Sequence, residues 1–288
     1  MIPDTRIAVI GLGLMGGSMA RALHVRGVHV LGFDRDGTQL EDALRDGAVQ
    51  EALAADLAGI TTADVVVLAL PVDATIALLP FLAARIGEAR LVMDLASTKR
   101  SIVAAAESAG LGPRFVGAHP LTGSHRTGWG ASRASLFEDA RVFLCPTRST
   151  TSAAMQLAES LWRELRAGVE VLDATIHDDQ MAWRSHLPHL LSSALAVTLR
   201  DAGVRRSALG PGGRDMTRLA GGSPAMWLPI VEDNAAAIVD AMAACEQHLR
   251  TFREAVMAGD RTATARFLQS GVEWFDGEPE RMLTRGTA

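Results

Sequence analysis

A glycine-rich turn near the amino terminus constrains the fold of this chain more than any other stretch. The apolar run Arg6–Ile10 leads into G-L-G-L-M-G, a helical pattern follows over residues 17–26, and the apolar run at residues 28–33 ends in Asp34. Glycines in such a turn permit a tight bend, close approach of the backbone to a pyrophosphate, and close packing of helix on strand. We therefore predict a dinucleotide-binding unit. The residues of the turn that we expect to contact the cofactor are Gly11, Gly13, Leu14, Met15 and Gly16.

The acid that ends the second apolar run indicates which dinucleotide binds. The carboxylate of Asp34 would accept hydrogen bonds from the hydroxyls of the adenosine ribose and would repel a 2′-phosphate, which favours NAD. Arg35 follows directly and is able to pair with a 2′-phosphate, so NADP remains an alternative.

Further apolar runs predict more strands of an open α/β sheet. They lie at residues 64–70, 91–95, 115–118, 141–145 and 169–172, and a helical pattern at residues 153–166 separates the last two. Ligands of such sheets bind outside the carboxyl ends of the strands. The polar or turn residues that we expect at this edge are Pro71, which would contact the cofactor, and Ser97, Lys99 and His119.

His119 is the best catalytic candidate at that edge. A neutral imidazole is able to accept the proton of a substrate hydroxyl while hydride leaves the same carbon, and its pKa lies near working pH. The glycine-containing loop that follows, from Gly123 to Gly130, is able to close over a ligand. The alternative is that His119 only caps a strand before a proline turn.

After Asp173 only long helical patterns follow, at residues 175–201, 224–258 and 261–275. The fold class that we predict is therefore α/β, with an N-terminal Rossmann dinucleotide-binding domain at residues 1–172 and an all-α domain at residues 173–288. The first of these helices contains S-H-L-P-H, Ser185 to His189, where Pro188 should bend the helix. Imidazoles beside a bend suggest the floor of a pocket, although a satisfied histidine pair is an equal alternative.

Two further patterns lie in the helical half. Arg214 and Arg218 are spaced i,i+4, and guanidinium groups on a rigid element suit a dicarboxylate, although on spacing alone a solvated helix face is slightly favoured. An apolar stripe that includes Ile238, Val239 and Leu249 suits a buried seam, either within the chain or between the subunits of a homodimer.

Composition excludes several classes of protein. The net charge of -5 argues against nucleic acid as a partner. Two cysteines make a disulfide framework improbable and favour a reduced cytoplasmic setting. There is no pattern of a signal peptide or a membrane span, and we expect neither a membrane partner nor a metal site.

In order, G-L-G-L-M-G-G-S, D-L-A-S-T-K, G-A-H-P-L-T-G, S-H-L-P-H, G-G-R-D-M-T-R-L-A and S-P-A-M-W resemble the motifs of the prephenate/arogenate dehydrogenase family of tyrosine biosynthesis. The resemblance covers nearly the whole chain. It implies NAD-dependent oxidative decarboxylation of prephenate to 4-hydroxyphenylpyruvate, or, as an alternative, an arogenate or dual-specificity cyclohexadienyl dehydrogenase. A 3-hydroxyacid dehydrogenase using Lys99 and a nucleotide sensor without turnover are remoter alternatives.

The resemblance also implies roles for single residues. His119 matches the catalytic histidine, Ser97 the serine that orients it, and Arg218 the arginine that grips the ring carboxylate. The residues that match those around the side-chain end of the substrate are Ser185, His189 and Trp227. Two positions depart from the family. Arg214 stands where some members have a lysine that reaches the site of the neighbouring subunit, and His125 stands where some have a gating acid. A homodimer through the C-terminal helices is implied.

Overall fold

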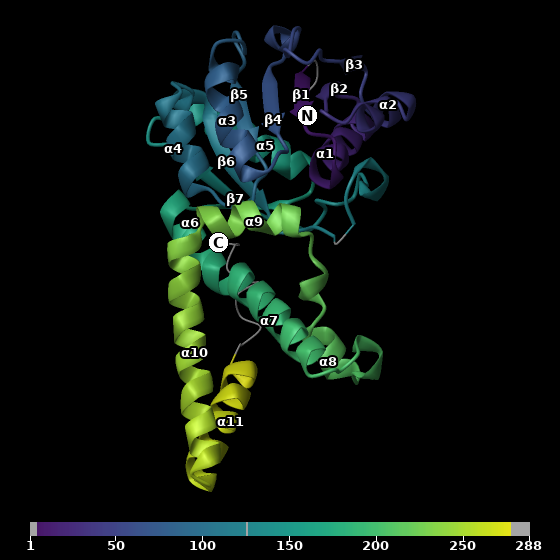
Figure 1. Ribbon diagram of the computed structural model, residues 1–288. Helices are drawn as coiled ribbons and strands as arrows, with labels where there is room; N and C mark the ends of the chain where they lie inside the picture. The colour runs from purple at the N-terminus through teal and green to yellow at the C-terminus, as the bar shows by residue number, and fades with distance from the viewer. Residues whose placement is uncertain (1–4, 125, 278–288) are drawn as a thin grey trace. The chain divides into compact units, whose positions relative to one another are not determined.

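The computed structural model describes residues 5–124 and 126–277 (Figure 1). Two compact units make up the chain. The first ends at Ala237 and the second begins at Ile238, so that α10 (Ala235–Met257) starts in one and continues in the other. In the described part of the chain no helix is both long enough and apolar enough to cross a membrane.

The first unit contains an eight-stranded sheet in the order β3-β2-β1-β4-β5-β6-β7-β8. The chain leaves β3 and crosses to the far side of β1 to form β4, so the strand order reverses between β1 and β4. This is the place where open α/β sheets bind ligands. The strands are β1 (Arg6–Ile10), β2 (His29–Phe33), β3 (Glu51–Ala52), β4 (Val65–Leu68), β5 (Leu91–Asp94), β6 (Phe115–Pro120), β7 (Arg141–Pro146) and β8 (Gly168–Val171). The prediction missed only β3, whose two residues are too few to show a period.

The last two strands, β7 and β8, run opposite to the first six. β7 pairs antiparallel with β6, with Gly117 opposite Cys145, and β8 then pairs parallel with β7. The described residues between β6 and β7 contain no crossover helix and form a loop that includes the short turn Trp129–Ala131. A connection of this kind returns the chain along the neighbouring strand in the opposite direction.

Helices cover both faces of the sheet. Alternate residues of β1 divide between two cores: Ile7 and Val9 pack on one face, and Ala8 and Ile10 on the other. This division explains the continuous apolar runs in the sequence, because a parallel strand covered on both faces has no polar side. The covering helices are α1 (Leu14–Val25), α2 (Gly37–Arg45) and α5 (Ser152–Glu164) on the first face, and α3 (Val72–Ala83) and α4 (Arg100–Ser108) on the second.

The glycine turn joins β1 to α1 through close backbone contacts. Gly11 has a φ of +93°, a conformation that favours glycine, and its N–H donates to the carbonyl of Phe33 at 2.8 Å. A Cβ at Gly16 would lie 1.8 Å from the carbonyl oxygen of Gly11. A Cβ at Gly13 would meet nothing within 4 Å, so this side of the turn is open.

The remaining elements are helices, which confirms the predicted fold class, whereas the domain limits at residues 172 and 173 stay a prediction. The helices that follow β8 are α6 (Ala174–Met181), α7 (Leu187–Asp201), α8 (Pro211–Met216), α9 (Pro224–Asp233), α10 (Ala235–Met257) and α11 (Arg261–Asp276) (Figure 1). Within the second unit, Phe252 of α10 packs on Phe267 of α11 with ring centroids 4.6 Å apart.

The helix predicted at residues 175–201 is continuous from Ala174 to Asp201, with π geometry at Ala182–His186 just before α7, whose second residue is Pro188. The second long helix was wrong in its continuity. The helix predicted at residues 224–258 breaks at Asn234, whereas Pro229 lies inside α9. The Asn234 side chain donates to the carbonyl of Asp178 at 2.8 Å, and this tertiary bond holds the break where no sequence signal marks it.

We expect Gly16→Ala to lower the free energy of unfolding by about 3 kcal/mol, because its new Cβ would overlap a backbone oxygen that is held by β1. Gly13→Ala is the matched control in the same turn and should change it by less than about 0.5 kcal/mol. Urea unfolding of the three proteins measures both effects. Equal stability of the two variants would contradict the close packing described for Gly16.

Candidate active site

A cleft of about 2000 Å³ lies at the carboxyl ends of β1, β4, β5 and β6, and the helical residues up to Ile230 close its other side. The cleft belongs entirely to the first unit. Its size exceeds that of a typical small-ligand pocket and leaves room for a dinucleotide beside a small substrate. The predicted site residues that line it are Gly13, Leu14, Met15, Pro71, Ser97, His119, Ser185, His189, Arg218 and Trp227.

The remaining predicted residues lie outside the lining of this cleft. Gly11 and Gly16 are buried under the turn that they shape. Asp34 follows β2, where its two oxygens accept hydrogen bonds from the backbone N–H of Leu12 at 2.6 Å and of Asp36 at 2.9 Å. Arg214 is exposed on α8. His125 lies outside the described residues.

The expectation that Lys99 faces this edge was wrong. Its side chain is fully buried, and Nζ forms an ion pair with the Asp94 carboxylate at the end of β5. A buried ammonium needs such a partner, because an unpaired charge in the interior is costly. Lys99 is therefore a structural cation next to the cleft, which removes the support for a 3-hydroxyacid dehydrogenase that uses it.

The glycine turn fits a dinucleotide. The first residues of α1 line the cleft, so backbone N–H groups at a helix amino terminus are available to an anion there. Because Gly13 has no side chain, the space beside it is open to a ligand. The Asp34 carboxylate is held in place by the hydrogen bond that it accepts from Leu12 of the glycine turn.

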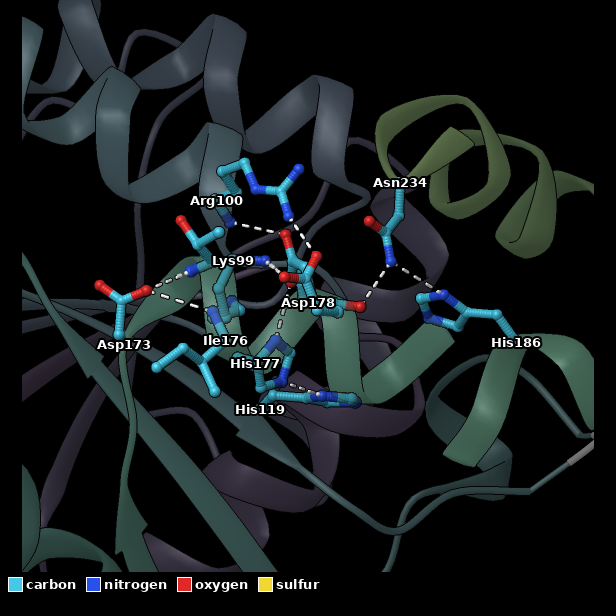
Figure 2. Close-up of polar contacts among 12 residues, drawn as sticks. Lys99, Arg100, His119, Asp173, Ile176, His177, Asp178, His186 and Asn234 are labelled. Atoms are coloured by element: carbon cyan, nitrogen blue, oxygen red, sulfur yellow. Dashed lines mark hydrogen bonds and ion pairs between the residues drawn. The ribbon is translucent and has the colours of Figure 1, made fainter. Parts of the chain in front are cut away.

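His119 lies at the end of β6 and is 8% exposed. Its Nδ1 is 2.9 Å from Nε2 of His177, which comes from α6 and is fully buried (Figure 2). Nε2 is the nitrogen that remains for the cleft. Burial, with further contributions from His177, Lys99 and His186, holds the pKa of His119 well below 6.5. The imidazole is therefore neutral at pH 7 and able to accept a proton.

Asp178 stands behind His177. Its Oδ1 is 2.8 Å from Nδ1 of His177 and also accepts the backbone N–H of Lys99, and its Oδ2 accepts the N–H of Arg100 (Figure 2). Burial raises the pKa of Asp178, but the hydrogen bond from His177 and the two backbone donors outweigh burial and bring the pKa below its usual value. Asp178 is therefore a carboxylate.

The S-H-L-P-H stretch divides between the cleft and the interior. Ser185 and His189 line the cleft, and the His189 ring stacks on Trp227 with centroids 3.5 Å apart. A Cβ at Gly222 would lie 2.6 Å from the His189 ring, so this glycine permits the stack. His186 points away from the cleft, where its Nδ1 is 3.3 Å from the amide nitrogen of Asn234.

Sequence reasoning missed several residues of the site. His177, Asp178 and Asn234 carry no motif of their own, and His177 is 58 residues from the histidine that it contacts. The basic side chains of the lining were missed except for Arg218. They are Arg126, Arg184, Arg200, Arg205 and Arg206. The adjacent pair Arg205 and Arg206, a few residues after Arg200, is a cluster in the sequence that could have found three of these five.

Comparison with known proteins agrees with this arrangement. The profile described as prephenate dehydrogenase, nucleotide-binding domain, matches residues 19–171, and the profile described as prephenate dehydrogenase, dimerization domain, matches residues 173–270. A prephenate dehydrogenase of Bacillus subtilis (strain 168) is 32% identical over 285 residues, covering 96% of this chain and 76% of that protein.

Two solved structures are similar over nearly the whole chain. The structure of prephenate dehydrogenase from A. aeolicus in complex with hydroxyphenyl propionate and NAD+ has a TM-score of 0.88 and 27% identity, covering 96% of this chain and 99% of that one. Synechocystis arogenate dehydrogenase has a TM-score of 0.80 and 28% identity, covering 95% and 99%.

We expect the free energy of unfolding to fall in acid because His186 is buried in its neutral form. Burial is the main cause that lowers the pKa of His186 from 6.5 to about 4, and Asn234 presents only donors to its Nδ1. The unfolded chain therefore binds the extra proton below pH 6.5, so this stability is present above 6.5 and is lost as pH falls towards 4. The loss between pH 7.5 and pH 5 should be about 2 kcal/mol.

Urea unfolding at the two pH values measures this loss. The comparison is with His186→Phe, which removes the titrating group and keeps a ring near Trp227. The loss in the variant should be smaller by about 2 kcal/mol. The same loss in both proteins would show that another group titrates.

Proposed function

Because this chain belongs to the prephenate dehydrogenase family, we propose that it catalyses the NAD-dependent oxidative decarboxylation of prephenate to 4-hydroxyphenylpyruvate in tyrosine biosynthesis. In that reaction hydride leaves the ring carbon that carries the hydroxyl, the hydroxyl loses its proton, and the ring carboxylate leaves as CO2 while the ring becomes aromatic. The observation that carries the proposal is His119, a neutral imidazole at the cleft whose Nδ1 is bonded inside the protein.

The first half of the chain, residues 1–172, is the part that we propose to hold NAD. Gly13, Leu14 and Met15 would hold the diphosphate at the start of α1, Pro71 lines the cleft with them, and Asp34 would accept the hydroxyls of the adenosine ribose. The bound nicotinamide supplies the acceptor for the hydride. The carboxylate at Asp34 favours NAD over NADP, because a 2′-phosphate would be repelled there.

His119 is the group that accepts the substrate proton through Nε2. Its low pKa keeps the lone pair available at pH 7, and Ser97 lines the same part of the cleft, where its hydroxyl is able to orient the ring hydroxyl. Decarboxylation is driven by aromatisation and needs no acid from the protein. The task of the remaining residues is therefore to hold the substrate in place.

The charges of the cleft favour prephenate over arogenate. Among the described residues, the lining contains six arginines and no aspartate or glutamate. Prephenate carries two carboxylates and a keto group, whereas arogenate carries an ammonium that would need an acidic partner. Burial lowers the pKa of His189, so the imidazole beside Ser185 and Trp227 is neutral and suits a keto group. Arogenate, or dual cyclohexadienyl specificity, is the second candidate, favoured by the likeness to the Synechocystis enzyme.

We propose further that the protein is a cytoplasmic homodimer joined through its C-terminal helices. The match to a dimerization domain supports the dimer, and so do large apolar side chains that are exposed in the single chain. They include Leu249 of α10 and Leu268, Trp274 and Phe275 of α11. Arg214, exposed outside the cleft of its own chain, is the residue that would reach the site of the other subunit.

His119→Ala should lower kcat for prephenate by about 10²–10⁴-fold, since it removes the proton acceptor. Formation of NADH followed at 340 nm measures the rate. The dissociation constant for NAD should stay within about threefold of the wild-type value, because His119 lies away from the glycine turn. Turnover near the wild-type rate would remove His119 from the mechanism.

Arg218→Ala should raise KM for prephenate about thirtyfold with little change in kcat. This corresponds to about 2 kcal/mol for the lost hydrogen bonds to a carboxylate. Arg218→Lys is the matched variant: it keeps the charge but loses the two-pronged geometry, so its KM should lie between the two. An unchanged KM in Arg218→Ala would exclude the anchoring role.

A further inference from the structure

We propose that His177 and Asp178 are positioning residues that hold His119 in the tautomer needed for proton abstraction. The inference rests on the proposed function, in which His119 is the base. Three groups form a chain from the interior to the cleft: the Asp178 carboxylate, the His177 imidazole and the His119 imidazole (Figure 2). Neither His177 nor Asp178 touches the cleft.

This series of side chains starts at the Asp178 carboxylate, and both of its oxygens accept hydrogen bonds. The backbone N–H groups of Lys99 and Arg100, at the start of α4, donate to Asp178 at 2.8 Å each. These donors come from the turn after β5, whereas Asp178 belongs to α6. Asp178 is 1% exposed, so its direction is set by the fold and not by solvent.

The carboxylate decides which nitrogen of His177 carries the proton. Because Asp178 only accepts, Nδ1 of His177 must be the donor across their 2.8 Å contact. With that single proton on Nδ1, Nε2 of His177 is the acceptor of the ring, and it lies 2.9 Å from Nδ1 of His119. The same donor and acceptor argument then applies to the His119 ring. His119 carries its proton on Nδ1, and its Nε2 faces the cleft with a lone pair.

Packing holds the His177 ring in the required plane. It meets the His119 ring edge-on, with centroids 5.1 Å apart and an interplanar angle of 72°, and it meets Phe143 of β7 edge-on at 5.4 Å. His177 is fully buried, so it cannot exchange its partners for water. On its own, a neutral histidine populates both tautomers, and only one leaves Nε2 free to accept the substrate proton.

Asp178 and His177 also stabilise the positive charge that forms on His119 during the reaction. When the substrate hydroxyl gives its proton to Nε2, His119 becomes an imidazolium and its Nδ1–H stays bonded to Nε2 of His177. The other charged or titratable groups around these rings are Lys99, Asp94, His186 and Cys145. Of these, Lys99 is a cation that opposes the new charge, so the Asp178 carboxylate offsets it through His177.

The tautomer of His119 is the direct test, and it needs neither substrate nor turnover. In protein labelled with ¹⁵N-histidine, NMR separates protonated from unprotonated ring nitrogens, and His119→Gln assigns the signal. We expect unprotonated Nε2 and protonated Nδ1 at pH 7.5. His177→Phe, which keeps a ring of similar size, should shift His119 towards the tautomer that is protonated at Nε2.

Kinetics separate positioning from packing. His177→Phe should lower kcat for prephenate by about 10–100-fold while KM stays within about threefold, because the substrate does not meet His177. His177→Gln, whose amide oxygen is able to accept from Nδ1 of His119, should restore part of the loss. It also serves as the second variant if His177→Phe does not fold, as judged by circular dichroism.

The proposal fails if His119 in the wild-type protein is protonated at Nε2 and not at Nδ1. It also fails if the tautomer is unchanged in folded His177→Phe, even where kcat falls, since the loss would then be structural. In His177→Gln, which keeps an acceptor for Nδ1, a His119 protonated at Nε2 would contradict it. A wild-type protein that shows the expected tautomer but no turnover of prephenate would instead contradict the proposed function and leave the positioning chain intact.

Discussion

The arrangement of the site depends on the hydrogen bonds of the Asp178 carboxylate. It accepts two backbone N–H groups from the start of α4 and faces a ring nitrogen of His177, and the carbonyl of the same residue accepts the side chain of Asn234. These bonds join the turn after β5, the first helix beyond the sheet and the break between α9 and α10. Since α6 leads directly into the stretch that lines the cleft, the position of Ser185 and His189 follows from where Asp178 is held.

The elements of the first half could be predicted from sequence because their signals are local. A strand covered on both faces appears in the sequence as a continuous apolar run, and the glycine turn is recognised from a motif of six residues. The helices of the second half were less predictable. Pro229 is the visible breaker, yet α9 continues through it and ends at Asn234, whose partner Asp178 is 56 residues away. A break made by tertiary hydrogen bonds leaves no trace in local periodicity.

The same limit applies to the candidate site. His119 and Ser97 could be proposed because both follow strands whose carboxyl ends share an edge. Lys99 follows the same strand as Ser97, but its side chain turns into the interior and forms an ion pair with Asp94. Only the folded structure shows that Ser97, and not Lys99, lines the cleft. His177 and Asp178 precede the S-H-L-P-H motif by two turns of helix and sit under His119 because α6 packs on the sheet.

These observations together suggest why a buried carboxylate belongs behind this histidine. A cleft lined by arginines attracts a substrate with two carboxylates, but the same positive field disfavours a second cation at His119. Burial adds to that cost, as the low pKa of His119 indicates. An acid in the cleft itself would offset the charge but would also repel the substrate. An acid placed behind His177 supports the imidazolium through a hydrogen bond while the surface that meets the substrate stays free of negative charge.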